Sequence, residues 1–391
     1  MDTTGIICEY NPLHLGHKKQ IDTVKAIHPD SGIVCLMSGN YVQRGSPAII
    51  DKSLRAKAAI LCGADLVLEL PLTASLSSAE GFAREGVRIL GGFCDRLCFG
   101  AESADKKALT DTAQALLCSD FPEALRRELD KGLSFPAARQ AALQSMGLQE
   151  DTLTHPNDIL ATEYCKAILQ LGLSMEPMPI LRGGHYHDMT AEEENPSATA
   201  VRNLMLHGKA WLDYVPEAAQ NTFRGASLHT LSKGEQPILY RLRTMTDGEY
   251  ETLPYGSEGL WRKLMHNARS LSTLEEILTA TKSKRYTRTR LDRMVMCAFL
   301  GLTQADLASP APYCRVLAFN DKGREILKTA RKTGLFPNTG ESVNHPYQEL
   351  EYRAGRLYSL FATDCVNSPH SEQNRRIFYQ ANITGGNNKD G

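Results

Sequence analysis

Residues 4–17 read Thr-Gly-Ile-Ile-Cys-Glu-Tyr-Asn-Pro-Leu-His-Leu-Gly-His, and this stretch decides how the chain begins to fold. The apolar run over residues 4–10 predicts a short buried strand. Asn11 and Pro12 favour a turn, and helical periodicity follows over residues 16–27. The chain therefore opens with a strand, a loop and a helix, and both histidines stand where the loop meets the helix.

The alternation of strands and helices continues downstream. We expect further strands over residues 31–37, 64–70, 96–99 and 177–181, and mainly helical segments over residues 53–61, 78–90, 105–148 and 157–171. Such alternation favours a parallel sheet with helical crossovers. The predicted fold class is α/β, with a Rossmann-like parallel-sheet domain over residues 1–206. Helical periodicity then dominates, which predicts a mainly α-helical region over residues 207–391.

Composition places the chain among globular proteins. Its 391 residues exceed one ordinary domain, and charged residues at 23% and hydrophobic residues at 42% exclude disordered and collagen-like chains. Ten cysteines include no CxxC pair and no zinc-type Cys/His quartet, which predicts reduced thiols in a cytoplasmic protein. No apolar stretch approaches the roughly 18 residues of a membrane span, so we expect no membrane insertion.

The formal net charge of -1 hides an asymmetry between the two halves of the chain. Residues 1–201 hold 18 Lys and Arg against 26 Asp and Glu, whereas residues 202–391 hold 26 against 19. A net positive second half is consistent with a polyanionic partner, and it is equally consistent with an ordinary solvated surface.

The two histidines are the strongest candidates for chemistry. In a doubly wound sheet ligands bind at the carboxyl ends of the strands, and a helix N-terminus there presents free backbone N–H groups to phosphate. Gly16 leaves room for a phosphate to approach the backbone. We therefore expect His14 and His17 to donate to the phosphates of a nucleotide as charge builds in the transition state. The alternative is a short HxGH pattern that arises by chance.

Other polar residues follow predicted strands or begin predicted helices. The loop over residues 38–47 is Gly-rich and polar, and it is either a surface loop or a second wall of the crevice that presents Asn40, Gln43 and Arg44. Gly100 would let adenine or ribose lie against bare backbone. Asn157 would read a base or hydroxyl, and Arg182 would hold a phosphate or carboxylate. Helix capping and a surface ion pair are the alternatives for these last two residues.

Two further segments carry hydroxyl or basic side chains. Residues 197–202 open a helix with two hydroxyls and Arg202, which would clasp a triphosphate, serve as a helix cap, or do both. Residues 282–293 hold six basic residues and one acidic residue. RNA is the polyanion this run suggests, with Tyr286 stacking on a base, and a solvated helix start is the alternative. The predicted RNA contacts are Lys284, Arg285, Tyr286, Arg288 and Arg290.

Taken together, several of these motifs resemble one known family. Residues 5–17, 38–45, 63–71, 197–202 and 284–287 are similar to the tRNA(Met) cytidine acetate ligase family, part of the HIGH-type nucleotidyltransferase superfamily. This chain departs from the family pattern at Leu13 and Leu15, where Phe and Asn are usual. It also has Asp158 where the family usually has Asn.

The resemblance implies a two-step reaction. Acetate and ATP would form acetyl-adenylate and pyrophosphate, and the N4 amine of the wobble cytidine in elongator tRNA(Met) would then take the acetyl group as AMP leaves. The resemblance places ATP against Gly100, Asn157 and Arg182, and along Ile7, Cys8, Glu9, Tyr10, Asn11, Pro12, Leu13, His14, Leu15, Gly16, His17, Lys18, Lys19 and Gln20.

Cofactor and partner expectations follow from the same chemistry. Mg²⁺ is expected because ATP chemistry normally needs it to offset phosphate charge, and no metal ligands are predicted in the protein itself. The expected partners are ATP, acetate and elongator tRNA(Met), with no obligate protein partner. Two alternatives stay open: an adenylyltransferase of the same fold that acts on a small acceptor, and a non-catalytic RNA-binding protein with a vestigial nucleotide pocket.

Overall fold

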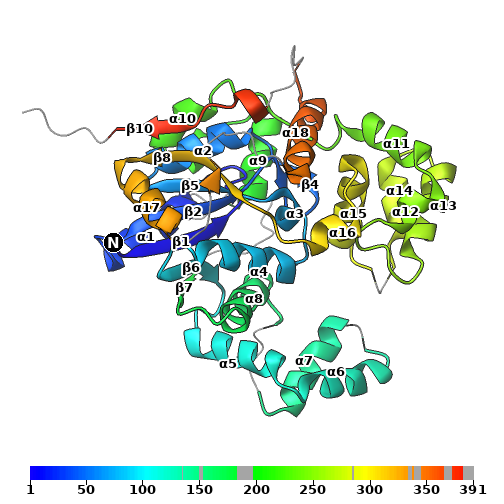
Figure 1. The fold of residues 1–391 in the computed structure, drawn as a ribbon. Helices are drawn as coiled ribbons and strands as arrows, with labels where there is room; N and C mark the ends of the chain where they lie inside the picture. Colours follow the sequence, from blue (N-terminus) through cyan, green and yellow to red (C-terminus); the bar gives the residue numbers. More distant parts are fainter. Residues whose placement is uncertain are drawn as a thin grey trace, which may run out of the picture.

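The computed structural model describes residues 1–133, 135–148, 153–182, 197–283, 286–332, 337–338, 345–364 and 372–381. At its centre lies a sheet with the strand order β10-β8-β5-β2-β1-β6-β7, and β9 pairs with β8 (Figure 1). These strands are β1 (Thr3–Cys8), β2 (Gly32–Ser38), β5 (Leu66–Leu70), β6 (Arg96–Ala101), β7 (Glu176–Leu181), β8 (Cys314–Asn320), β9 (Pro337–Asn338) and β10 (Phe378–Gln380).

Five neighbouring strands of this sheet are parallel. β1 pairs with β2 and β6, β2 pairs with β5, and β6 pairs with β7, all in parallel register. β8 runs antiparallel to β5 and pairs on its other side with β10, which lies at the edge of the sheet. The predicted α/β class with a mostly parallel sheet is therefore confirmed. A small antiparallel pair, β3 (Tyr41–Val42) and β4 (Ser46–Pro47), forms part of the loop after β2.

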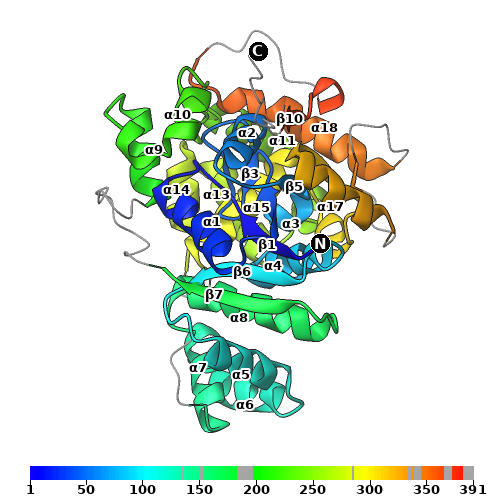
Figure 2. The same cartoon turned by 90° about the vertical axis from the view of Figure 1, so that its left-hand side faces the viewer.

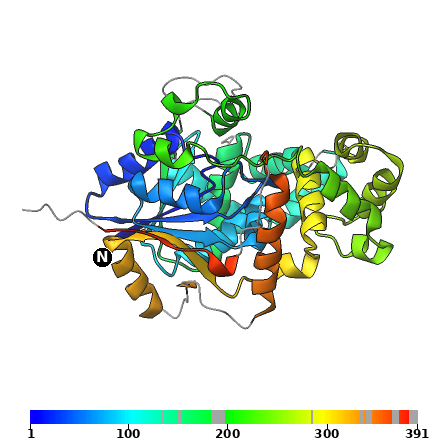
Figure 3. The same ribbon diagram turned by 90° about the horizontal axis from the view of Figure 1, so that it is seen from above.

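Helices cover both faces of the sheet, because alternate residues of each strand point to opposite sides (Figure 3). One face is covered by α1 (Leu15–Ile27), α2 (Lys52–Leu61), α9 (Ala198–Leu206) and α10 (Glu217–Phe223). The other face is covered by α4 (Ala79–Leu90), α5 (Lys106–Leu117), α8 (Pro156–Gln170) and α17 (Asp321–Lys332), near the one-turn helix α3 (Leu72–Ser75).

Two helical units lie beside this layered core. One has its own apolar core and lies on the right in Figure 1; it includes α11 (Glu235–Thr244), α12 (Asp247–Glu251), α13 (Leu260–Ser270), α14 (Leu274–Thr281), α15 (Arg288–Leu300), α16 (Gln304–Ala308) and α18 (Pro346–Tyr358). The other joins α5 to α6 (Phe121–Asp130) and α7 (Phe135–Ser145) and projects away from the sheet (Figure 2). Short 3₁₀ turns are η1 (Leu212–Tyr214), η2 (Ser359–Phe361) and η3 (Glu372–Asn374).

The sheet draws strands from both sides of residue 206, where the sequence prediction ends the sheet domain. β8 and β10 come from the region predicted to be mainly helical, yet they extend the same sheet next to β5. The first five residues of β8 are all buried, but Arg315 interrupts their apolar run, so the sequence does not mark this segment clearly as a strand. Strands from the C-terminal part of the chain, β8 and β10, therefore belong to the same sheet as β1 from its N-terminal part.

Within the described ranges, no helix combines the length and apolar character that a membrane crossing requires.

Candidate active site

The carboxyl ends of β1, β6 and β7 lie together at a switch point of the sheet. From β1 the strand order runs to β2 on one side and to β6 on the other. At such a point the connections leave in opposite directions, so a crevice opens between them and ligands bind there. The predicted residues after β1, β6 and β7 therefore belong to one region, although up to 168 positions separate them in the sequence.

His14 and His17 form the capping box of α1. The Nδ1 atom of His14, the N-cap residue, accepts the backbone N–H of Gly16 at 3.1 Å, and Nδ1 of His17 accepts the N–H of His14 at 3.3 Å. The two rings lie 3.8 Å apart between centroids. A Cβ on residue 16 would stand 3.0 Å from Cε1 of His14, so Gly16 makes room for this ring. Both imidazoles are thus locked at the helix N-terminus.

This geometry also decides which ring nitrogens carry protons. Burial first, and then the nearby Arg182 and Arg202, lower the pKa of His14 to about 3. Burial first, and then the neighbouring His14 and Arg182, which disfavour a second positive charge, hold the pKa of His17 well below its usual range. Both rings are therefore neutral at pH 7, and because Nδ1 accepts in each ring, the proton sits on Nε2.

The Nε2 atom of His14 is buried and has no hydrogen-bond partner within the described structure. Buried polar groups are almost always hydrogen-bonded, so an unpaired donor of this kind indicates a ligand site. With a helix N-terminus and two arginines beside it, the site suits an anion.

The loop between β1 and α1 is held from several sides. Tyr10 has a φ of 45°, a left-handed conformation that costs a non-glycine residue about 1–3 kcal/mol. The Asn11 side-chain oxygen accepts the Ile49 N–H at 2.7 Å, and the Glu9 carboxylate accepts the Gln43 N–H at 2.9 Å. These bonds fix the path of the chain into His14.

Arg55 is the residue of this region that sequence reasoning missed. Its side chain is fully buried, and Nη1 donates to the carbonyl oxygens of Glu9 at 2.5 Å and Ser38 at 3.1 Å. Nε donates to the Ile50 carbonyl at 2.8 Å. Arg55 thus ties together the ends of β1 and β2. In the sequence it stands among Lys52, Lys57 and alanines, and nothing distinguishes it from an exposed basic residue.

Gly100, Asn157 and Arg182 lie near one another in the structure. Arg182 donates from Nη1 to Oδ1 of Asn157 at 2.8 Å, and a Cβ on Gly100 would contact Arg182 Cβ and Cδ at 3.7 Å. The Asn157 amide donates in turn to the Glu102 carboxylate at 2.6 Å. The charge of Arg182 also lowers the pKa of both histidines.

The segment that opens α9 caps this helix and contacts the histidine loop. Ser197 caps the helix by accepting the Ala200 N–H at 3.0 Å. Arg202 donates to the Asn11 carbonyl at 2.7 Å and to the Thr199 hydroxyl at 2.9 Å. Arg202 therefore joins α9 to the histidine loop, so both roles considered for this segment from the sequence are compatible with its geometry.

The loop over residues 38–47 makes mainly internal bonds. Asn40 accepts the Lys52 N–H at 2.8 Å and donates to Asp51 at 3.1 Å, so it supports the start of α2. The Gln43 side chain donates to the Ser77 carbonyl at 3.3 Å, and Arg44 is exposed. Most residues of this loop are buried, so the surface-loop alternative is wrong. The Asn40 and Gln43 side chains bond within the protein, and the Gln43 backbone N–H donates to Glu9.

The remaining residues of the predicted ATP-binding stretch belong to β1, to α1 or to the loop between them. Gln20 donates to the Cys98 carbonyl at 3.3 Å and so links α1 to β6. Lys18 forms an ion pair with Asp22, and Lys19 is exposed. Leu13 is fully buried, so this side chain contributes packing. Ile7 and Cys8 belong to β1.

The basic run lies at the start of α15, in the helical unit. Arg288 pairs with both carboxylate oxygens of Glu275 at 2.7 Å and with Asp292 at 2.8 Å. Arg290 donates to the Tyr255 carbonyl at 2.8 Å and lies over the Tyr286 ring. Lys284 and Arg285 lie outside the described residues. The arginines of this run that are described are thus engaged within the protein.

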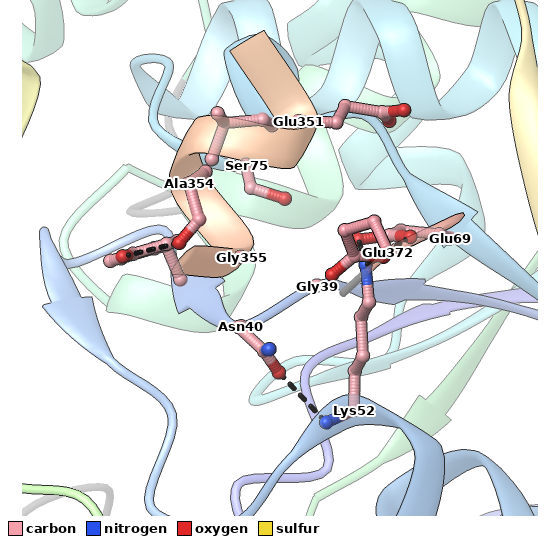
Figure 4. A pocket seen from close by; sticks show the side chains of 11 residues that line it. Gly39, Asn40, Lys52, Glu69, Ser75, Glu351, Ala354, Gly355 and Glu372 are labelled. Atoms are coloured by element: carbon pink, nitrogen blue, oxygen red, sulfur yellow. Dashed lines mark hydrogen bonds and ion pairs between the residues drawn. The ribbon is translucent and has the colours of Figure 1, made fainter. Parts of the chain in front are cut away.

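A small pocket apart from the histidine site lies at the carboxyl ends of β2 and β5 (Figure 4). Lys52 enters it and pairs with Glu69 at 2.6 Å and with Glu372 at 2.9 Å. Glu351 lines the same pocket, and burial raises its pKa to about 7. This pocket is a buried ion cluster that connects α2, β5, α18 and η3. No group of three or more His, Cys, Asp or Glu side chains suited to a metal ion occurs in the described parts of the chain.

Comparison with known proteins gives consistent relationships. The family model described as HIGH Nucleotidyl Transferase matches residues 1–374. The chain is 35% identical over 385 residues to the tRNA(Met) cytidine acetate ligase of Clostridium acetobutylicum, which covers 92% of this chain and 96% of that protein. It is 38% identical over 358 residues to the protein of the same name from Clostridium novyi, covering 86% and 89%.

Solved structures show the same relationship in three dimensions. The apo crystal structure of Thermotoga maritima TmcAL superposes with a TM-score of 0.90, and the form bound with alpha-thio ATP superposes with a TM-score of 0.87. Each is 29% identical to this chain and covers 98% of it, with 100% of the other chain matched.

Proposed function

The chain belongs to the HIGH nucleotidyl transferase family and, within it, to the tRNA(Met) cytidine acetate ligases, and we propose that it activates acetate with ATP and acetylates a tRNA cytidine. One observation carries the proposal: the buried Nε2–H of His14 at the N-terminus of α1, which has no hydrogen-bond partner among the described residues. ATP would supply the anion that this donor lacks. The ATP analogue bound by Thermotoga maritima TmcAL supports this choice.

In the first proposed step, an acetate oxygen attacks the α-phosphorus of ATP. The bond from that phosphorus to the bridging oxygen breaks, and pyrophosphate leaves. Negative charge grows on the phosphate oxygens, where His14 and His17 donate hydrogen bonds and Arg182 and Arg202 supply positive charge. Because these groups are already in place, they lower the barrier without reorganising.

In the second proposed step, the N4 amine of the wobble cytidine of elongator tRNA(Met) attacks the carbonyl carbon of acetyl-adenylate. The bond from that carbon to the AMP oxygen breaks, and the amine loses one proton. The products are N4-acetylcytidine and AMP. The net positive half of the chain, with Lys284 and Arg285, supports an RNA substrate.

Mg²⁺ belongs to the proposal as a companion of ATP. Since the described residues offer no three-ligand cluster, the ion would be held mainly by phosphate oxygens and water, which is the usual manner for this metal. It would offset phosphate charge. We place the reaction in the cytoplasm, where ATP, acetate and tRNA are available, and it requires no further protein.

The test is acetylation by the full-length protein. Incubated with ATP, Mg²⁺, acetate and unmodified elongator tRNA(Met), it should form N4-acetylcytidine, detected by mass spectrometry of the nucleosides. The variant H17A should lose this activity while tRNA binding, measured by filter binding, stays nearly unchanged. H28A is the matched control, because it removes an imidazole from the C-terminal end of the same helix.

The outcomes separate the candidate functions. ATP turnover without acetylcytidine would favour the adenylyltransferase of a small acceptor. Binding of tRNA without any ATP turnover would favour the non-catalytic RNA-binding protein. Full acetylation by H17A would remove the assigned role of this histidine.

A further inference from the structure

A carboxylate beside the histidine site has no role in the reaction described so far. Glu102 follows β6 and is half-buried. One of its oxygens accepts the Asn157 amide at 2.6 Å, and the other accepts the Asp158 backbone N–H at 2.8 Å. Asp158 returns the contact, because its Oδ1 atom accepts the N–H groups of Glu102 at 2.8 Å and Ser103 at 3.2 Å. This reciprocal clamp joins the end of β6 to the start of α8, which lie side by side in Figure 2.

The clamp also orients an amide. A carboxylate only accepts hydrogen bonds, so the Asn157 NH₂ group must face Glu102. The Asn157 oxygen is then turned toward Arg182, whose guanidinium only donates, and it accepts Nη1 at 2.8 Å. Glu102 therefore determines the orientation of the Asn157 amide, and this orientation determines which atom of the amide faces Arg182.

We propose that Glu102 is a positioning residue, which through Asn157 fixes the Arg182 guanidinium at the phosphates of ATP. The inference rests on the proposed ATP site. Glu102 itself does not touch the substrate; it removes the freedom of Asn157 to turn over and of Arg182 to move away. A guanidinium held in advance loses less conformational entropy when the phosphates arrive.

The diagnostic variant is E102Q. A glutamine offers one oxygen and one NH₂ group, so it can satisfy either the Asn157 amide or the Asp158 N–H, but not both. Loss of one charge-assisted bond predicts about tenfold weaker ATP binding by the full-length protein in calorimetry. Two matched carboxylate-to-amide controls exist. E176Q lies at the amino end of β7 and should bind ATP like the parent protein. D158N keeps the acceptor oxygen that serves Glu102 and Ser103, and should lose clearly less than E102Q.

A double-variant comparison separates positioning from mere stability. In an R182A background there is no guanidinium to place, so adding E102Q should weaken ATP binding by less than about twofold. N157A gives a second route: it should weaken binding as E102Q does, and E102Q should add little to it. A full tenfold loss on top of R182A would overturn the proposal, as would D158N losing as much as E102Q.

Failure of the proposed function gives a different result. If the parent protein takes up no ATP, the ATP site itself is wrong. If the parent protein binds ATP and E102Q binds it equally well, only the role of Glu102 falls.

Discussion

At the scale of single residues, burial determines the protonation of His14. The pKa of this ring falls to about 3 in the folded protein, against 6.5 for an ordinary histidine. Between these values the unfolded chain binds more protons than the folded chain, so the free energy of unfolding decreases as the pH falls from about 6.5 toward 3. The stability is fully present above 6.5, and each such group contributes a slope of at most about 1.4 kcal/mol per pH unit.

The variant H14Q should therefore lose less of its free energy of unfolding as the pH falls. We expect the parent protein to lose more of its free energy of unfolding than H14Q between pH 7 and pH 5, because glutamine does not titrate. Urea unfolding at the two pH values measures the difference, and H28A is again the control. Parallel losses in the parent protein and H14Q would show that His14 does not titrate with a depressed pKa.

At the scale of elements, the loop after β2 lies directly against α15. Gly45 has a φ of 76°, and a Cβ there would stand 2.4 Å from the backbone nitrogen of Arg293. We expect G45A to lower the free energy of unfolding by clearly more than 1 kcal/mol, because it combines an unfavourable φ with a clash against helix backbone.

Gly132 offers a matched control for this substitution. Its φ is 84°, and a Cβ there would meet nothing within 4 Å. G132A therefore carries the backbone cost alone, about 1 kcal/mol. Chemical denaturation of both variants gives the cost of the contact as the difference, and equal losses would mean that the loop moves off α15 without penalty.

The start of α15 also bears on the proposed binding of tRNA. Arg288 forms ion pairs with Glu275 and Asp292, so its positive charge is offset within the protein. We expect the double variant K284A/R285A to weaken tRNA binding and to lower its salt dependence by up to about two phosphate contacts. R288A should change both much less. Filter binding at several salt concentrations tests this, and an equal effect of R288A would show that its ion pairs open on the RNA.

At the scale of the whole molecule, buried charges attach the end of the chain to its beginning. Lys52 lies between Glu69 and Glu372, and Arg375 pairs with Asp51 at 2.6 Å. K52M would leave the buried Glu69 without this cation, whereas Glu372 would keep its ion pairs with Arg315 and Arg375. We expect a loss of about 3–5 kcal/mol in the free energy of unfolding.

K107M is the control for this change. Lys107 forms an exposed ion pair with Asp111 within α5, and such pairs contribute about 0.5 kcal/mol or less. Urea unfolding measures both variants. A loss for K52M no larger than for K107M would mean that water reaches the cluster and replaces the ammonium.

The sequence by itself determined much of this protein, because its signals are local. The alternating apolar runs place β1, β2, β5, β6 and β7, and the position of His14 and His17 between a strand and a helix indicates the crevice. The carboxyl ends of parallel strands meet at one edge of a sheet, so the order of elements along the chain is enough to expect Gly100, Asn157 and Arg182 at the same edge.

Only the tertiary structure decided the features that depend on distant partners. β8 belongs to the sheet because it pairs with β5, some 250 positions earlier in the chain. The seven residues of β8 by themselves do not predict this pairing. Arg55 is a buried anchor, and Arg288 is an internally paired charge, because of which carbonyls and carboxylates surround them. Hydrophobic periodicity reports the face a residue occupies, whereas hydrogen bonds and ion pairs depend on groups that only folding brings together.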